Sequence, residues 1–339
     1  MRVFLTGGAG YLGSTLVPRL LSAGHDVTVL DRFFFGMGTL PADGTDGRLH
    51  LIRDDVRWCS GRVLEGAEAV IDMAALSNDP AGALDPWTTY EINYLGRSRF
   101  ARLAREAGVR RYLMTSSCSI YGFQTEVLTE ESVPRPLTAY ARANVLIEQD
   151  NLPLASPTFS PTAVRFATLY GLSPRMRFDL AINGMVLGAT KTGKIPTMRD
   201  GTQWRPFLHV QDAARALEEL LNAPVDAVSG KVFNLGSDEQ NFQIRPLAER
   251  VASAMAHPPE LEWYGDADDR SYRVSFAKVR EALDFQPRLG PEEAVREIES
   301  ALASGRVAPS PQTKTVDWYR HLLSDPQAAE AVRLRGVVL

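Results

Sequence analysis

The first fourteen residues constrain the fold of this chain more than any other stretch. A short apolar run at residues 3–5 is followed by glycines at positions 7, 10 and 13, and an amphipathic stretch covers residues 11–23. This order predicts a strand, a glycine-rich turn and a helix. In such a unit the first glycine permits a tight turn, the second lets the backbone approach a pyrophosphate, and the third lets the helix pack on the strand. The helix N-terminus then offers unpaired N–H groups to the phosphates.

The second strand of the pattern, residues 26–30, ends in Asp31 and Arg32. A carboxylate at this place can accept hydrogen bonds from the adenosine ribose and repel a 2′-phosphate, which favours NAD over NADP. Arg32 leaves the alternative open, because a neighbouring arginine can accommodate a 2′-phosphate. Asp31 is otherwise only a carboxylate at the start of a loop. The residues that we assign to the dinucleotide on this basis are Gly7, Gly10, Tyr11, Leu12, Gly13, Asp31 and Arg32.

Strand-like and helical runs alternate through the first half of the chain. Residues 50–53, 69–73, 111–115 and 163–169 have the pattern of strands, and residues 87–107 and 138–150 that of helices. This alternation predicts an α/β fold with a doubly wound parallel (Rossmann) sheet. Ligands of such sheets bind beyond the carboxyl ends of the strands, so functional residues are expected just after each strand.

The pattern becomes irregular after residues 170–171, which suggests a second lobe. We expect an NAD-binding Rossmann domain over residues 1–171, with 206–235 returning to it. A smaller mixed α/β substrate lobe would be built from C-terminal segments, residues 172–205 and 236–305. Residues 306–339 would form a linker, at 306–315 and rich in Pro, Ser and Thr, and then a C-terminal helix around residues 315–323.

Composition excludes several classes of function. The 339 residues carry a net charge of −4, so neither a nucleic acid nor a membrane is an expected partner. Two cysteines, Cys59 and Cys118, form no disulfide framework, and residues 1–6 begin a strand rather than a signal peptide, which fits a cytoplasmic protein. No apolar run reaches the length of a transmembrane helix. The five histidines show no ligand spacing, so no metal site is expected.

Two further motifs follow the predicted strands. Residues 115–122 read Thr-Ser-Ser-Cys-Ser-Ile-Tyr-Gly, and Tyr140-Ala-Arg-Ala-Asn144 opens a helix. With these, with the glycine turn and with Arg-Pro-Phe-Leu-His-Val at 205–210, nearly the whole chain resembles the extended short-chain dehydrogenase/reductase family, in its nucleotide-sugar epimerase and dehydratase branch. The resemblance implies NAD as cofactor, a nucleotide-sugar substrate and a homodimer formed by the helices after Trp87 and Tyr140. The additional residues that it assigns to the cofactor are Asp55, Val56, Ala74, Ala75, Asn93, Tyr140 and Asn144.

The resemblance also implies the chemistry. Tyr140 would take a proton from a sugar hydroxyl while NAD takes hydride from the same carbon. Ser117, four residues before Tyr121, would hydrogen-bond that hydroxyl. The physical requirements agree, because a phenol must be near its ionised state to act as a base and the reacting oxygen needs a positioned donor. The structural alternatives are a serine that caps a turn and a half-buried aromatic residue at a helix start.

Asn144 departs from the family, which has lysine at this position. That lysine binds the nicotinamide ribose and lowers the tyrosine pKa. An unperturbed tyrosine titrates near ~10, and a nearby cation lowers such a pKa by about 1–3 units. Asparagine can still bond the ribose but supplies no charge. Three explanations remain open: a slow enzyme, a protein that has lost the redox step and kept binding, or an engineered residue that traps a complex.

The residues around Ser117 bear on the type of reaction. The 4,6-dehydratases of the family carry an acid where this chain has Ser119, often after an Asp where it has Cys118; β-elimination needs an acid, so a dehydratase is disfavoured. The 3,5-epimerising members place their cysteine one residue away from Cys118, whose favoured interpretation is a small buried apolar group. Family diphosphate contacts suggest Asn183, Arg205 and Arg270, which are otherwise a helix-start amide and surface arginines. The residues assigned to the substrate are Ser117, Cys118, Ser119, Asn183, Arg205 and Arg270.

A C4 epimerase needs only the serine, the tyrosine and tightly held NAD, with a keto intermediate that turns within the site. We therefore predict an NAD-dependent nucleotide-sugar epimerase that acts at C4 through a transient 4-keto intermediate, with Ser117, Tyr140 and Asn144 as its catalytic residues. The alternatives are a nucleotide-sugar oxidoreductase (ketoreductase) and a catalytically weakened NAD or nucleotide-sugar binding protein.

Overall fold

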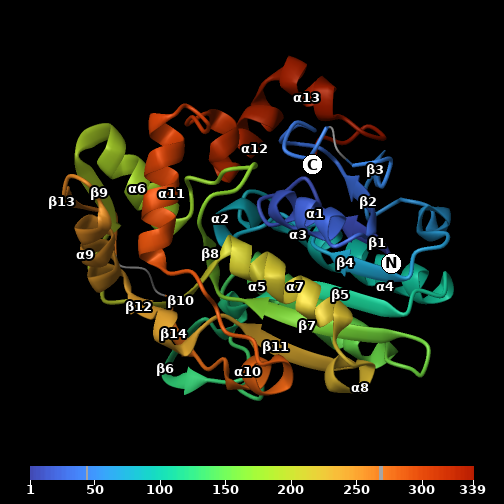
Figure 1. Ribbon diagram of the computed structural model, residues 1–339. Helices are drawn as coiled ribbons and strands as arrows, with labels where there is room; N and C mark the ends of the chain where they lie inside the picture. Colours follow the sequence, from blue (N-terminus) through green and yellow to red (C-terminus); the bar gives the residue numbers. More distant parts are fainter. Residues whose placement is uncertain (43–44, 267–269) are drawn as a thin grey trace.

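A parallel sheet forms the centre of the computed structural model, which describes residues 1–42, 45–266 and 270–339 (Figure 1). Its strands are β1 (Arg2–Thr6), β2 (Asp26–Asp31), β3 (Leu49–Arg53), β4 (Ala69–Asp72), β5 (Arg111–Ser117), β7 (Ser160–Phe166) and β11 (Lys231–Leu235). Their order is β11-β7-β5-β4-β1-β2-β3, and neighbouring strands pair in parallel. This arrangement confirms the predicted doubly wound Rossmann sheet.

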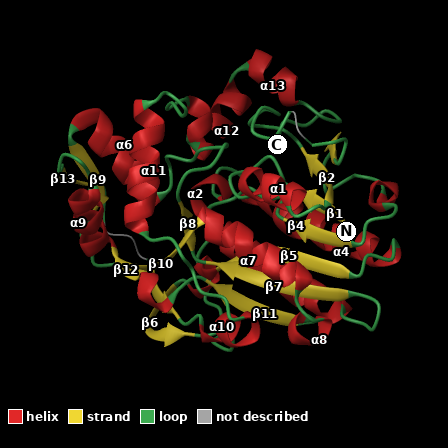
Figure 2. Ribbon diagram, in the orientation of Figure 1, coloured by secondary structure: helices red, strands yellow, loops and turns green. Residues whose placement is uncertain are grey.

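Helices cover both faces of this sheet, because successive side chains of each strand point to opposite faces. Val3 and Leu5 belong to the apolar cluster that includes α1 (Gly13–Ser22) and α7 (Val210–Asn222). Phe4 belongs to the opposite cluster, and its ring lies 5.7 Å from that of Phe100. The helices that group there are α3 (Pro86–Tyr90), α4 (Arg97–Glu106) and α5 (Ala139–Asn151), with a π-helical turn at Glu91–Gly96 between α3 and α4 (Figure 2).

A smaller lobe lies beside the carboxyl ends of the central strands (Figure 1). It has its own apolar core, in which Tyr170 and Phe207 pack with helices. Its helices are α6 (Ala181–Thr192), α9 (Ile244–Ala254) and α11 (Pro291–Ala303). Its strands are β8 (Thr168–Tyr170), β10 (Trp204–His209) and β12 (Asn241–Gln243), and the pair β9 (Lys194–Met198) and β13 (Glu260–Tyr264). Of residues 206–235, β10 pairs with β8, whereas β11 pairs with β7 of the central sheet, α7 packs on α1, and Val228 joins their apolar cluster.

The remaining elements link the lobes and close the chain. Strands β6 (Phe123–Leu128) and β14 (Ser271–Val274) pair with each other, and the short helices are α2 (Asp79–Gly82), α8 (Val225–Val228) and α10 (Ala277–Leu283). The C-terminal segment forms α12 (Thr315–Ser324), where a helix was expected, and then α13 (Pro326–Val332). Helix α12 packs against α2 and α13, and Tyr319 and Leu322 join the apolar cluster of Phe4.

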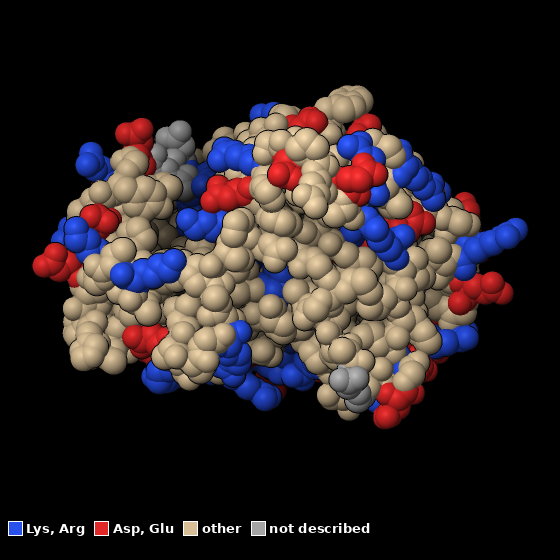
Figure 3. Space-filling view, turned by 90° about the horizontal axis from the view of Figure 1, so that it is seen from above, with Lys and Arg blue, Asp and Glu red and all other residues tan. Residues whose placement is uncertain are grey.

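Surface charge and helix length complete the description. On the face shown in Figure 3, acidic and basic side chains are interspersed over both lobes rather than gathered by sign. Among the described residues, no helix combines the length and the apolar character that crossing a membrane requires.

Candidate active site

A cavity of about 910 Å³ opens between the carboxyl ends of the central strands and the smaller lobe. This is the place where doubly wound sheets bind their ligands. The predicted cofactor residues that form its wall are Gly7, Gly10, Tyr11, Leu12, Gly13, Asp31, Arg32, Asp55, Val56, Ala74, Ala75, Tyr140 and Asn144. The predicted substrate residues in the wall are Ser117, Ser119, Arg205 and Arg270. One cavity therefore contacts both sets.

The glycine loop fits a phosphate group for steric reasons. Gly7 has φ +69°, and a Cβ on it would stand 2.8 Å from the Ala74 backbone nitrogen. A Cβ on Gly13 would stand 2.5 Å from the Gly8 carbonyl oxygen. Both positions therefore require glycine, which holds the loop against β4 and α1 against the loop. No side chain caps the N-terminus of α1, but the Ser14 and Thr15 amides donate to the Gly10 and Leu12 carbonyls, so a ligand would meet the amides just before them.

Asp31 stands at the wall with its carboxylate held in place. Its Oδ2 accepts a hydrogen bond from the Ala9 amide at 2.9 Å, and its Oδ1 accepts one from the Phe33 amide at 2.7 Å. Burial raises the pKa of this carboxyl, and the backbone hydrogen bonds act in the opposite direction. The carboxylate is thus fixed at the end of β2, where an adenosine ribose would meet it.

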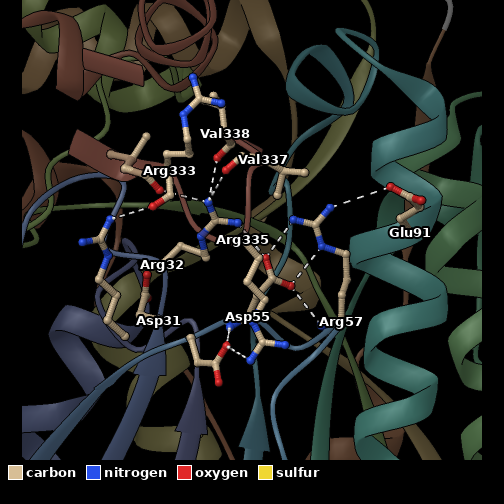
Figure 4. A network of polar contacts seen from close by, with 12 residues as sticks. Asp31, Arg32, Asp55, Arg57, Glu91, Arg333, Arg335, Val337 and Val338 are labelled. Atoms are coloured by element: carbon tan, nitrogen blue, oxygen red, sulfur yellow. Dashed lines mark hydrogen bonds and ion pairs between the residues drawn. The ribbon is translucent and has the colours of Figure 1, made fainter. Parts of the chain in front are cut away.

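Arg32 is committed to the protein itself (Figure 4). Its Nη1 donates to Asp55 Oδ2 at 2.8 Å, and its Nη2 donates to the carbonyls of Val332, Val337 and Val338 at 3.0, 3.2 and 2.9 Å. The guanidinium therefore closes the C-terminal segment onto the Rossmann domain. Since Arg32 is held this way, the prediction that it accommodates a 2′-phosphate finds no support in the geometry.

Asp55 is shared between two arginines. Arg57 also donates to its carboxylate, through Nε at 3.0 Å and Nη2 at 2.8 Å (Figure 4). Burial acts to raise the pKa of Asp55, but the bonds from Arg57 and Arg32 outweigh it and lower that pKa. Any contact of Asp55 with a cofactor is therefore made by a carboxylate that is already ion-paired.

The predicted serine and tyrosine meet in the cavity. Ser117 ends β5, and its Oγ accepts a hydrogen bond from the Ser119 amide at 3.1 Å. Tyr140 lies in the first turn of α5, whose N-cap Thr138 accepts from the Ala141 amide at 3.1 Å. Asn144 lies one turn further on, so its side chain shares a helix face with Tyr140. Its Nδ2 is buried and has no hydrogen-bond partner among the described residues.

Several groups act on the Tyr140 phenol. Burial is the main cause that raises its pKa above 10.0, and the Asp79 carboxylate adds to this. Asn144 and Ser117, which face the phenol, lower the pKa, as does the charge of Arg97, but the net shift is upward. The protein alone therefore holds Tyr140 protonated at neutral pH. NAD fits this corner, because the orphaned Asn144 amide is a donor available to the hydroxyls of a nicotinamide ribose.

The substrate side of the cavity also has unpaired polar atoms. Ser119 Oγ and Gln203 Oε1 are buried, belong to the wall and have no partner among the described residues. Arg205 donates to the Trp204 carbonyl at 2.8 Å and to the Arg270 carbonyl. Arg270 pairs with Asp79, which also accepts from Thr138 at 2.5 Å. A polar ligand can satisfy the orphaned atoms, which cost free energy when buried without a partner.

Two predicted substrate residues, Cys118 and Asn183, do not belong to the wall of the cavity. Cys118 is buried in the core behind Ser117 and donates to the Arg165 carbonyl at 3.3 Å, as its apolar alternative implied. Burial raises the pKa of its thiol. Asn183 is buried beneath the wall, where it accepts from the Gly171 amide at 2.8 Å and donates to the Arg177 carbonyl at 2.9 Å. Both side chains form hydrogen bonds to backbone groups and so hold nearby segments of the chain in place.

Asn93, which was predicted to contact the cofactor, does not belong to the wall of the cavity either. It lies in the π-helical turn, where its Oδ1 accepts from the Leu76 amide at 2.8 Å and its Nδ2 donates to the Leu76 carbonyl at 3.1 Å. It therefore fixes the chain just after Ala74 and Ala75, which do form the wall. Asn93 supports the cofactor site through the backbone rather than by contact.

Sequence reasoning missed several charged residues of the wall. Arg175 and Arg177 lie in a loop before α6; Arg175 stacks over the Phe35 ring at 3.5 Å, and Arg177 pairs with Asp179 at 2.7 Å. Burial lowers the pKa of Arg175 to about 10. Asp79 and Arg97 were missed as well. The only sequence signal was the Pro-Arg-Met-Arg run at 174–177 in an otherwise apolar stretch.

The fold and the cavity together define a dinucleotide-binding protein of the extended short-chain dehydrogenase/reductase type. The model of the NAD dependent epimerase/dehydratase family matches residues 3–236. The chain therefore belongs to this family, which confirms the predicted resemblance and makes NAD its cofactor.

Two relatives and one solved structure show how the chain compares with known members. It is 30% identical to a UDP-glucose 4-epimerase of Mycolicibacterium smegmatis, over 87% of this chain and 96% of that protein. It is 27% identical to UDP-glucuronic acid decarboxylase 1 of Arabidopsis thaliana, over 88% of this chain and 69% of that protein. MoeE5 in complex with UDP-glucuronic acid and NAD superimposes with a TM-score of 0.78 at 28% identity, covering 90% of this chain and all of that one. These names span more than one reaction.

The described residues hold no group of three or more His, Cys, Asp or Glu side chains that could bind a metal ion.

Proposed function

We propose that this protein is an NAD-dependent nucleotide-sugar epimerase that acts at C4 through a transient 4-keto intermediate. The observation that carries the proposal is the meeting of Ser117 and Tyr140 in the cavity that the glycine loop enters. The carboxylate that acts on Tyr140, Asp79, is held by Thr138 and Arg270 and is therefore poorly placed to donate a proton to a leaving hydroxyl. This disfavours elimination.

A nucleotide sugar suits the charge of the cavity. Arg175, Arg177, Arg205 and Arg270 lie in its wall, and guanidinium groups bind phosphate oxygens through paired donors. The names of the relatives support the same class, since both of the curated proteins and the MoeE5 complex involve UDP-sugars.

The residues of the chain would act as follows. In its ionised form, Tyr140 accepts the proton of the C4 hydroxyl, and the Ser117 hydroxyl donates a hydrogen bond to the same oxygen. NAD, held by the glycine loop, Asp31 and Asn144, would supply the acceptor and then the donor of the C4 hydride, whose return to the opposite face of the ketone inverts C4. Tyr140 then gives its proton back to the oxygen, so protons and electrons balance over the cycle. The Asn144 amide orients the nicotinamide ribose. Proton transfer of this kind contributes about 10²- to 10⁴-fold to rate.

The decisive experiment is to incubate the purified protein with NAD and separate UDP-sugars and to follow the C4 configuration by proton NMR. Epimerised sugar without net NADH supports the proposal, with Tyr140→Phe as the inactive control. Stoichiometric NADH together with a released oxidised sugar would favour the oxidoreductase alternative. Binding without either product would favour the weakened binding protein that Asn144 suggests.

We also propose a homodimer. Trp87 and Leu95, near the start of the helical group on one face of the sheet, are 70% and 52% exposed. Exposed apolar side chains of this size favour a partner surface. Light scattering on the purified protein tests this. A protein that remains monomeric as its concentration is raised would contradict it.

A further inference from the structure

Arg97 is a buried cation with a fixed place in the site. It opens α4, directly after the π-helical turn, and only 1% of it is exposed. Its Nε donates to Asp72 Oδ2 at 2.8 Å, and its Nη2 donates to the carbonyls of Asp72 and Thr115 at 2.9 and 2.8 Å. These bonds anchor the guanidinium between the carboxyl ends of β4 and β5.

The same guanidinium forms part of the cavity wall, together with Tyr140 and Asn144. Its Nη1 donates to none of the described residues, whereas Nε and Nη2 are fully used. The neighbouring α5 contributes Asn144, a neutral amide, where a cation would be expected. A positive charge is thus present in this corner, but it comes from a different helix.

Few other charges face the phenol. Asp79, from α2, acts to raise the pKa of Tyr140, and Arg270 pairs with that carboxylate. Asp72, on β4, is the partner of Arg97. Glu148, further along α5, is bound by Arg165 at 2.6 Å and by the Ser116 hydroxyl at 2.5 Å. Of these groups, Arg97 is the one whose charge lowers the pKa of Tyr140.

We propose that Arg97 supplies, from α4, the positive charge that Asn144 does not supply from α5, and that it favours the ionised form of Tyr140. Arg97 is a positioning residue, because it acts through the phenol. The inference rests on the proposed function only in taking Tyr140 as the base. The Asp72 carboxylate offsets part of the charge, so the effect of Arg97 is smaller than that of an unpaired lysine.

The ion pair allows a test in which the two partners move the pKa in opposite directions. Tyrosine labelled with ¹³C at Cζ reports ionisation in the free protein, and the Tyr140 signal is assigned by its loss in Tyr140→Phe. Asp72→Asn removes the counter-charge and should lower the Tyr140 pKa relative to the wild type. Asp72→Asn combined with Arg97→Gln removes both charges and should raise that pKa by about one pH unit or more relative to Asp72→Asn.

Comparing these two variants avoids the buried unpaired carboxylate that Arg97→Gln alone would leave, which is strongly destabilising. Asp72→Asn with Arg97→Lys keeps a cation and should retain the lower pKa. A matched control is Asp212→Asn with Arg215→Gln, which removes a buried pair 2.9 Å apart on α7 and should leave Tyr140 unchanged. Circular dichroism confirms that each variant is folded.

Equal Tyr140 titration in Asp72→Asn and in its combination with Arg97→Gln would overturn the inference, whatever the activity. If the Tyr140 pKa shifts as expected but the protein shows no turnover, the role of Arg97 stands and only the proposed function is contradicted. Where turnover is present, the alkaline rise of its pH–rate profile should move in the same order as the NMR titration; an order that differs would also overturn the role of Arg97.

Discussion

The two ends of the cavity differ in how their polar groups are satisfied. At the adenosine end, Asp31 and Asp55 are bonded by backbone amides and arginines of the chain itself. At the catalytic end, Asn144 Nδ2, Ser119 Oγ and Gln203 Oε1 are buried without partners among the described residues. Unsatisfied buried groups cost about 1–3 kcal/mol each. The carboxylates of the first end are therefore held before a ligand arrives, although Arg32 Nε is buried there without a partner among the described residues, whereas the three atoms of the second end can be satisfied by a ligand.

The largest effect should come from the catalytic end. Tyr140→Phe removes only the phenolic oxygen, so turnover should fall by about 10²- to 10⁴-fold while the ring still packs. The affinity for NAD, measured by calorimetry, should stay within a few-fold. A variant that turns over at the wild-type rate would show that Tyr140 is not the base and would remove the chemical distinction between the two ends.

The next largest effect should come from the adenosine end. A Cβ at Gly13 would stand 2.5 Å from Gly8 O, so Gly13→Ala must displace α1 or the loop. Overpacking of this kind costs about 1–3 kcal/mol, which corresponds to roughly 5- to 150-fold weaker NAD binding. Gly38→Ala is the control, because none of the described residues lies within 4 Å of a Cβ there. Equal NAD affinity of both variants would mean that the loop is not rigid.

Asn144→Lys should increase turnover near neutral pH by changing the charge at the catalytic end. The phenol is active when deprotonated, and its pKa is raised, so activity should increase as the pH rises toward that pKa. A lysine lowers the Tyr140 pKa and should move this increase to lower pH, with about tenfold more turnover near pH 7 for each pH unit by which the pKa falls. Rates from pH 6 to 10 test this. An unchanged profile would mean that Arg97 already supplies the full effect or that Tyr140 has another role.

The smallest effect concerns Ser119. Its hydroxyl makes no hydrogen bond with any of the described residues, so Ser119→Ala should leave the melting temperature unchanged or slightly higher. If the hydroxyl meets the sugar, KM should rise by about fivefold, which is the value of one neutral hydrogen bond. Thermal unfolding and steady-state kinetics together test this. A large loss of stability would contradict the view that the Ser119 hydroxyl finds a hydrogen-bond partner only when a ligand binds.

What the sequence could predict follows from the range of each signal. The glycine loop, Asp31, Ser117 and Tyr140 are local features attached to the ends of strands and the start of a helix, and the structure brings them to one cavity. Cys118 was assigned to the substrate because it directly follows Ser117, but its side chain is buried in the core. Neighbouring residues point in different directions, so a motif locates a segment but not the side of the chain that faces the ligand.

Other features depend on partners far away in the chain. Arg32 has the local context of a ribose-binding arginine, but its bonds go to carbonyls about 300 positions later, which no local pattern encodes. Arg97 sits in an ordinary amphipathic helix, and only the pairing of β4 with β5 places Asp72 and Thr115 to hold it at the cavity. Burial of a charge is decided by tertiary packing rather than by the residues beside it.

The contacts of Arg32 and Arg53 with the C-terminal segment also determine when the adenosine end can be completed during synthesis of the chain. The glycine loop is synthesised first, yet Arg32 and Arg53 receive their carbonyl partners only from residues 331–338. A nascent chain on the ribosome would hold a β1–α1–β2 unit whose outer side is still open. Firm retention of the dinucleotide is thus expected late in biosynthesis, after the last helices have docked, and a protease cut between α12 and α13 should return the mature protein to that early state.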